Sequence, residues 1–365
     1  MTYTHYGWQV SPYSAKTRSY FQFKKIPFTD VVPSAIRFYF IQKAVGRIIM
    51  PTVLQPDGTW LQDSSEIIQT LEARYPDRSI IPPGPKQKLT SLLLEMHADE
   101  WLPLISLNTR WNIPENHNFA IQEFARDGFP FLPSFIGKKM SAPMARKMQS
   151  YLPVLGITEK TIPGIQSFRA ELIAELNTHL EQYPFLLGSR PCLGDFSLYG
   201  PLWAHCYRDP GSRHLFDDAP ALVRWFERLA SPDGSVGEFL KDDEVPSTLS
   251  PILKTLFSEQ WSYLLTLVEK IDAWCEKNPD AQRVPRALGN CVFKVGGHTD
   301  QRRLLTFMQW KAQRALEAYA AFSTEEQESV DLWLDSIGFK DALKLKIANP
   351  LERKNFKMLL KNRPS

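Results

Sequence analysis

Apolar residues in the first 75 positions follow two periods in turn, the alternation typical of strands and the three-to-four-residue spacing typical of helices. Strands are predicted over 5–10, 28–32, 50–54 and 59–61, and helices over 12–24, 33–43 and 64–74. Pro56-Asp57-Gly58 joins the last two strands and is a typical hairpin turn. The order βαβαββα predicts one small mixed sheet flanked by helices, an α+β domain.

The strand pattern almost disappears after the proline-rich break Ile81-Pro82-Pro83-Gly84-Pro85. Helical spacing then predicts helices over 89–104, 142–152, 165–180, 195–207 and 219–230. A polar stretch at 231–234 leads to a third, mainly helical part, with helices over 249–276 and 301–321 and one opened by the capping box Ser323-Thr324-Glu325-Glu326. The expected domains are therefore 1–84, 85–237 and 238–365.

Composition narrows the class of protein. The chain has 365 residues, enough for two or three domains, and its 43% hydrophobic and 23% charged residues are typical of soluble globular proteins. It has no run of about 18 apolar residues, so no membrane span is predicted. The polar and aromatic start, Met1 to Val10, shows no secretory signal, which favours a cytoplasmic protein.

Cysteines and histidines give no metal-binding pattern. The four cysteines lie far apart and are interpreted as reduced thiols, and His97 has no second ligand three or four residues away. No metal site is predicted. Residues 338–365 hold eight basic and two acidic side chains. This segment is interpreted as a solvated helix face that packs on an acidic body, not as a site for nucleic acid or membrane.

Three short motifs could carry chemistry. Ser11-Pro12 follows a predicted strand and opens a helix, where backbone N–H groups favour an anion, although Ser11 could simply be the helix N-cap. In Met50-Pro51 the proline stands at a strand start or in a cis turn. Asp63-Ser64 opens another helix, either as a cap paired with Glu66 or as a site for the carboxylate and ammonium of an amino acid.

The order and spacing of these motifs carry a resemblance. Residues 1 to about 235 resemble a cytosolic glutathione S-transferase of the serine type, with a thioredoxin-like first domain and an all-α second domain. The second half matches through Pro184-Phe185-Leu186-Leu187-Gly188 and through the segment 191–201, in which Cys192 replaces the usual Ser or Thr. Residues 238–365 have no counterpart in a minimal transferase and are expected as a mainly helical extension.

The resemblance implies a role for each motif. Ser11 is expected to donate a hydrogen bond to the glutathione sulfur and keep it as thiolate, with Tyr6 and Tyr13 as alternatives. Met50, before a presumed cis Pro51, is expected to pair with the cysteinyl backbone. The γ-glutamyl head is expected to bind Asp63 and Ser64, and the glycyl carboxylate is expected to bind Arg37.

The resemblance also implies a second pocket, for a hydrophobic electrophile, between the first two domains. Its expected lining is Tyr13, His97, Trp101 and Trp111, with Arg110 beside them, although Trp101 could instead belong to the core. The predicted activity is glutathione transfer by a homodimer, with glutathione as co-substrate. Two alternatives stay open: a non-enzymatic ligand-binding or assembly module, suggested by the extension, and a glutathione-dependent lyase, isomerase or dehalogenase.

Overall fold

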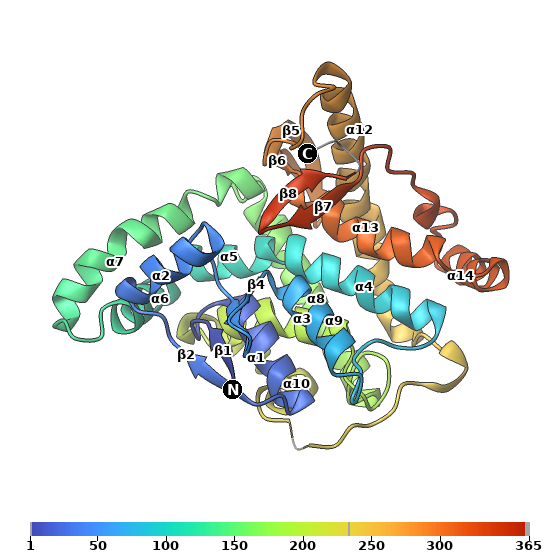
Figure 1. The fold of residues 1–365 in the computed structure, drawn as a ribbon. Helices are drawn as coiled ribbons and strands as arrows, with labels where there is room; N and C mark the ends of the chain where they lie inside the picture. Colours follow the sequence, from blue (N-terminus) through green and yellow to red (C-terminus); the bar gives the residue numbers. More distant parts are fainter. Residues whose placement is uncertain (1, 233, 362–365) are drawn as a thin grey trace.

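The computed structural model of the protein describes residues 2–232 and 234–361. Its first domain holds a four-stranded sheet with the strand order β2-β1-β3-β4. Strand β1 pairs in parallel with β2 and antiparallel with β3, which in turn pairs antiparallel with β4. The strands are β1 (Tyr3–Tyr6), β2 (Phe28–Val31), β3 (Thr52–Leu54) and β4 (Trp60–Gln62), and the helices are α1 (Pro12–Lys24), α2 (Ala35–Val45) and α3 (Ser64–Arg74). The predicted βαβαββα order is confirmed (Figure 1).

Local signals at both ends define helix α1. Ser11 is its N-cap, and its side chain accepts a hydrogen bond from the backbone N–H of Ser14. Pro12 occupies the first turn, where its missing N–H costs nothing. The helix ends at Lys25, whose backbone has a φ of 54°. The N-cap at Ser11 fixes the start of α1, which follows β1 along the chain. The Ser11 hydroxyl therefore lies in the loop that leaves the carboxyl end of β1.

The second domain is entirely helical, as predicted. Its centre is helix α9, which packs against α1 of the first domain and against α4. The carboxylate of Asp195 accepts the N–H of Cys192 at 2.8 Å and the indole N–H of Trp225 at 2.9 Å, which fixes the start of α9. The helices are α4 (Pro85–Glu100), α5 (Pro103–Asn112), α6 (Pro114–Gly128), α7 (Ser134–Gln149), α8 (Ile162–Gln182), α9 (Leu193–Pro201) and α10 (Pro220–Ala230).

The C-terminal extension is mainly helical but also contains two hairpins. Its helices are α11 (Ser250–Thr255), α12 (Trp261–Lys277), α13 (Phe307–Ala320) and α14 (Thr324–Ser336), and its strands are β5 (Ala287–Val295), β6 (His298–Leu305), β7 (Leu351–Lys354) and β8 (Lys357–Leu360). The predicted capping box of α14 is confirmed at Ser323 and Glu326. A short distorted turn of helix at Leu256–Gln260 joins α11 to α12.

Two predictions for the extension were wrong. Residues 301–305 belong to β6 instead of a helix, because Gly296 and Gly297, both with positive φ, turn the chain back on β5. The basic segment after residue 338 forms the hairpin β7–β8 instead of a helix face, and Asn355 and Phe356 make its turn, also with positive φ. Residues 362–365 of that segment lie outside the described residues.

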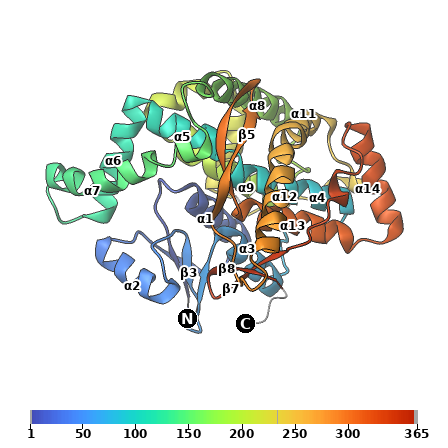
Figure 2. The ribbon, with the colours of Figure 1, turned by 90° about the horizontal axis from the view of Figure 1, so that it is seen from above.

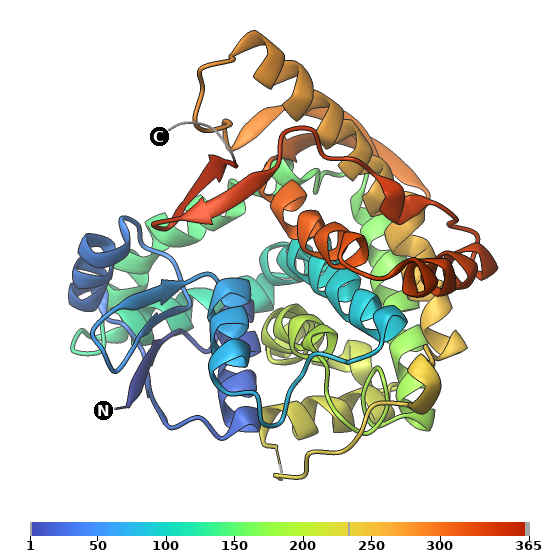
Figure 3. The same ribbon diagram turned by 45° about the vertical axis from the view of Figure 1, so that its right-hand side comes forward.

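The extension packs along one side of helix α4. Helices α13 and α14 both contact α4, and Figure 3 shows them running beside it. One continuous cluster of buried side chains includes Phe21 of the first domain, Phe196 of the second and Leu264 of the extension. Figure 2 shows α6 and α7 on one side of the molecule and α12 to α14 on the other. Among the described residues, no helix is long and apolar enough to cross a membrane.

Candidate functional site

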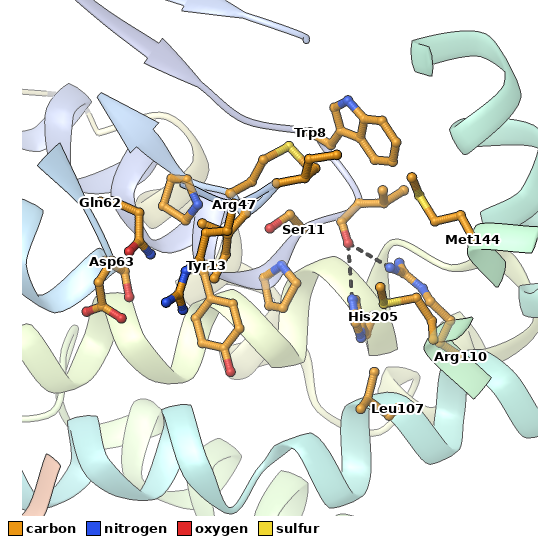
Figure 4. A pocket seen from close by; sticks show the side chains of 18 of the residues that line it. Trp8, Ser11, Tyr13, Arg47, Gln62, Asp63, Leu107, Arg110, Met144 and His205 are labelled. Carbon is orange, nitrogen blue, oxygen red and sulfur yellow. Dashed lines mark hydrogen bonds between the residues drawn. The ribbon is translucent and has the colours of Figure 1, made fainter. Parts of the chain in front are cut away.

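A cavity of about 530 Å³ lies where the three parts of the chain meet. One wall is apolar and comes from the first two domains, with the side chains of Trp8, Phe38, Trp111, Phe124, Met144 and Met148. The opposite wall is polar and includes the extension, with Asp63, Ser64, Glu100, Lys311 and Arg353. Figure 4 shows Ser11 between Asp63 on one side and Trp8 and Met144 on the other. The cavity can therefore hold a polar group and an apolar group on either side of one hydroxyl.

The loop that carries Ser11 is held in place by two buried side chains. The carbonyl oxygen of Val10 accepts a hydrogen bond from Nη1 of Arg110 at 2.6 Å and another from Nε2 of His205 at 3.1 Å (Figure 4). Burial, followed by the charge of Arg110, holds the pKa of His205 well below its ordinary value, so this imidazole is neutral. Arg110 in turn forms an ion pair with the buried carboxylate of Asp209 at 2.6 Å. These contacts fix where Ser11 sits.

The two tyrosines considered as alternatives to Ser11 have other contacts. The hydroxyl of Tyr13 lines the cavity but donates a hydrogen bond to the backbone carbonyl of Asp99 at 2.9 Å, and burial raises its pKa well above the ordinary value. The ring of Tyr6 stacks on Trp60, with 5.6 Å between the centroids. The Ser11 hydroxyl accepts a 3.3 Å hydrogen bond from Ser14 N–H, and its own hydrogen can donate into the cavity.

The other two motifs from the first domain also reach the cavity. The peptide bond between Met50 and Pro51 is cis, as predicted, and both residues line the cavity. Asp63 is the N-cap of α3, where its carboxylate accepts the N–H of Ser65 at 2.9 Å. Its φ of 84° is uncommon for a residue with a side chain, and such strained positions cluster at functional sites. Ser64 follows Asp63 and is buried at the cavity wall.

Arg37 does not reach the cavity. It lies on an exposed turn of α2, because the buried face of that helix carries Phe38 and Ile41. A different arginine, Arg47, lines the cavity from the loop before Met50, and no hydrogen bond or ion pair to it is found among the described residues. Burial, followed by repulsion from arginines 286, 353 and 283, lowers the pKa of Arg47, which shows that this end of the cavity is rich in positive charge.

His97 and Trp101 do not line the cavity, and Trp101 belongs to the core, the alternative that the sequence analysis left open. His97 is buried, its Nδ1 lies 2.7 Å from the side-chain oxygen of Gln260, and burial lowers its pKa to about 4. Trp101 is buried under the guanidinium of Arg302, which lies 4.6 Å from its ring. Gln260 and Arg302 belong to the extension, which covers this face of α4. Trp111 does line the cavity, as predicted, together with Arg110.

Besides Arg47, three further charged residues at the site were missed by the sequence analysis. Glu100, the last residue of α4, lines the cavity, and burial raises the pKa of its carboxyl to about 8 even though Lys311 acts in the opposite direction. Lys311 lies on α13, where its Nζ is 2.7 Å from Asp99 and also contacts the hydroxyl of Ser65. Burial alone would lower the pKa of Lys311, but Asp99, followed by Asp63 and Glu95, raises it.

The third missed residue, Arg353, lies on β7 and is almost fully buried against α3. Its Nε is 3.0 Å from Glu66, its Nη2 donates to the side-chain oxygen of Gln62 at 2.7 Å, and its Nη1 lies 3.7 Å from Asp63. Glu66 therefore pairs with the extension and does not close a capping box on Asp63. The only sequence signal for Arg353 was the basic composition of residues 338–365.

Comparisons with known proteins agree with this architecture. Residues 6–79 match the family model for the glutathione S-transferase N-terminal domain, and residues 168–233 match the model for the C-terminal domain. Similar solved structures include a glutathione S-transferase from Rhodospirillum rubrum F11, at 15% identity over 67% of this chain and 97% of that one, with a TM-score of 0.43. A glutathione S-transferase from Methylobacterium radiotolerans JCM 2831, in complex with glutathione sulfonate, is 22% identical over 67% and 100% of the chains, with a TM-score of 0.39.

A third similar structure is the beta-etherase LigF from Sphingobium sp. strain SYK-6, at 17% identity over 64% of this chain and 97% of that one, with a TM-score of 0.46. The family matches stop at residue 233, so residues 238–361 are an addition to the two family domains. The chain therefore contains matches to both domains of the glutathione S-transferase family, the N-terminal one at residues 6–79 and the C-terminal one at residues 168–233.

Proposed function

We propose that the protein is a glutathione S-transferase that activates the glutathione thiol for attack on a hydrophobic electrophile. One observation carries this proposal: Ser11, Met50 and the pair Asp63-Ser64 converge on one cavity whose other wall is apolar. The thiol would lie at Ser11, the peptide backbone of glutathione at Met50 and the γ-glutamyl head at Asp63-Ser64.

The chemistry required of Ser11 is modest. A free thiol has a pKa of about 8.5, and a hydrogen bond to a charged sulfur is worth roughly 1.5–3 kcal/mol. The positive end of the α1 dipole adds about 0.3–1 kcal/mol. At about 1.4 kcal/mol per pKa unit, these contributions lower the thiol pKa by roughly one to three units. Most bound glutathione would then be thiolate at neutral pH.

The two ends of glutathione require different charged partners, because the γ-glutamyl end carries an ammonium and a carboxylate and the glycyl end carries a carboxylate alone. The carboxylate of Asp63 suits the ammonium of the γ-glutamyl group, and the N-terminus of α3 at Ser64 suits the adjacent carboxylate. Arg47 takes the place of Arg37 as the cation for the glycyl carboxylate, because it lines the cavity on the side of Met50. The electrophile then binds against Trp8, Phe38, Trp111 and their apolar neighbours.

Two measurements test this proposal. The first is calorimetric titration with glutathione, and the second is a conjugation assay with a panel of chloronitrobenzenes and other neutral electrophiles. Binding together with conjugation is the expected result. If glutathione does not bind, the proposal fails. Tight binding without turnover on any electrophile would support the alternative of a ligand-binding module instead.

Glu100 leads to a prediction about pH. Its carboxyl is neutral at pH 7 and ionises near pH 8, which adds a negative charge to a cavity that must hold a thiolate. A repulsion of about 1.4 kcal/mol between the two charges corresponds to a tenfold effect. We therefore expect kcat/KM to fall by about tenfold between pH 7.5 and 9.5.

Glu100→Gln keeps the neutral form at every pH and should remove this fall without changing kcat/KM at pH 6.5. The measurement is the steady-state rate across the pH range. The substrate is a chloronitrobenzene, because its chloride leaves without taking up a proton. A fall that persists unchanged in Glu100→Gln would assign the alkaline inflection to another group.

A further inference from the structure

The extension brings two positive charges to the first turn of α3. Lys311 from α13 contacts the hydroxyl of Ser65, and Arg353 from β7 contacts the backbone and side chain of Gln62. Both cations line the same cavity as Asp63 and Ser64. Both therefore lie close to Asp63 and Ser64, where the γ-glutamyl head would bind.

Arg353 is held rigidly and keeps a donor for a ligand. Its guanidinium lies 5.9 Å from the ring centre of Phe307 and 5.6 Å from that of Trp310, and its side chain is only 6% exposed. Its Nε lies 3.0 Å from the carboxylate of Glu66, and its Nη2 donates to Gln62. Among the described residues, the third nitrogen, Nη1, has only the 3.7 Å approach to Asp63, which is too long for a hydrogen bond.

Lys311 has a similar arrangement. Its ammonium group has three donors, and the hydrogen bonds found in the described part of the chain are with Asp99 and Ser65. Asp99 also receives the buried ammonium of Lys16 at 2.8 Å, so its negative charge is shared between two lysines. The cavity side of Lys311 thus keeps part of its positive charge for an anion.

We propose that Lys311 and Arg353 make the extension part of the glutathione site, where they bind the α-carboxylate of the γ-glutamyl group while Asp63 binds the adjacent ammonium. This inference rests on the proposed function. The charges match in kind: an amino-acid head group carries one positive and one negative charge on the same carbon, and the cavity wall offers the carboxylate of Asp63 together with two cations. The extension would then be required for recognition of glutathione and not only for stability.

Two truncated ligands separate the contacts. Aminobutanoyl-cysteinylglycine, with the amino group at carbon 4, lacks only the α-carboxylate of glutathione, and glutaryl-cysteinylglycine lacks only the ammonium. We expect Arg353→Gln to weaken glutathione and the glutaryl analogue by about tenfold, the size of one lost hydrogen bond to a charged group. It should leave the aminobutanoyl analogue unchanged, because that ligand has no carboxylate for Arg353 to bind.

Calorimetry with the full-length protein measures all three dissociation constants. Lys354→Gln is a matched control, because it removes the same charge from the next position of β7, which is exposed and does not line the cavity. Arg353→Lys is a second variant that keeps the charge facing Glu66, and it should retain most of the affinity even if Arg353→Gln does not fold.

Three results would overturn the inference. Tighter glutathione binding by Arg353→Gln would show that Arg353 occupies the ammonium position and blocks the site. An equal loss for glutathione and the aminobutanoyl analogue would show a structural role without a contact to the carboxylate. Unchanged glutathione affinity in Arg353→Gln would show that Arg353 makes no contact with the ligand. If the unmodified protein binds none of the three ligands, the proposed function itself fails, an outcome distinct from these three.

Discussion

Ser11→Ala is expected to leave glutathione bound but to raise the pKa of its thiol by roughly one to two units. The substitution removes the hydroxyl donor while Met50, Asp63 and Ser64 keep their contacts with the peptide, so affinity should change little. The lost hydrogen bond to the thiolate is worth roughly 1.5–3 kcal/mol, which corresponds to a 10- to 150-fold lower kcat/KM at neutral pH. A pH titration of the complex with glutathione, followed by the ultraviolet absorbance of the thiolate near 240 nm, measures this pKa directly.

Ser14→Ala is the matched control. The Ser14 hydroxyl is three residues away on α1 and is fully buried, without a hydrogen-bond partner among the described residues, so its loss should cost neither stability nor activity. If Ser11→Ala and Ser14→Ala gave the same thiol pKa as the unmodified protein, another group would have to stabilise the thiolate. The hydroxyl of Tyr13 would then be the next candidate to test.

The parts of the fold that were predicted correctly are those encoded by neighbouring residues. Helices α1 and α3 begin where the sequence analysis placed them, because Ser11 with Pro12 and Asp63 are capping signals that act within three residues. The cis bond at Pro51 also follows from a dipeptide. Three motifs of the site were therefore visible in the sequence although they lie far apart along the chain.

The parts that were missed depend on contacts between distant residues. Helical spacing shows that His97, Trp101 and Glu100 lie on one helix, but not which face the extension covers. His97 meets Gln260, 163 residues later, and Arg353 meets Gln62, 291 residues earlier. A single arginine in a basic segment carries no sign of such a partner. The charged wall of the cavity could thus be recognised only in three dimensions.

Strand β6 shows a related limit. Its buried residues, Arg302 and Leu304, alternate with exposed ones, but the arginine breaks the apolar pattern that would identify a strand. In the structure, the guanidinium of Arg302 is buried over the rings of Trp101 and Tyr263, so a charged residue occupies a core position. Sequence periodicity counts such a residue as exposed and therefore favoured a helix that starts too early.

Asp209→Ala is expected to lower the free energy of unfolding by about 3–5 kcal/mol, because it leaves the buried guanidinium of Arg110 without its counter-charge. Two hydrogen bonds, at 2.7 and 2.6 Å, join these side chains, and both are almost fully buried. The same guanidinium holds the carbonyl of Val10, so the position of Ser11 should also be disturbed and kcat should fall. Urea unfolding followed by tryptophan fluorescence, alongside steady-state rates, measures both effects.

An exposed ion pair provides the control for the Asp209→Ala variant. Lys361 and Glu317 lie 3.3 Å apart, but their side chains are 45% and 58% exposed, so water screens the attraction. Glu317→Ala should therefore change stability by about 0–1 kcal/mol and leave kcat unaltered. Arg110 also donates hydrogen bonds to the backbone carbonyls of Val10 and Ala204. Equal effects of Asp209→Ala and Glu317→Ala would mean that these two carbonyls alone satisfy Arg110. The ion pair would then have no part in placing the Ser11 hydroxyl.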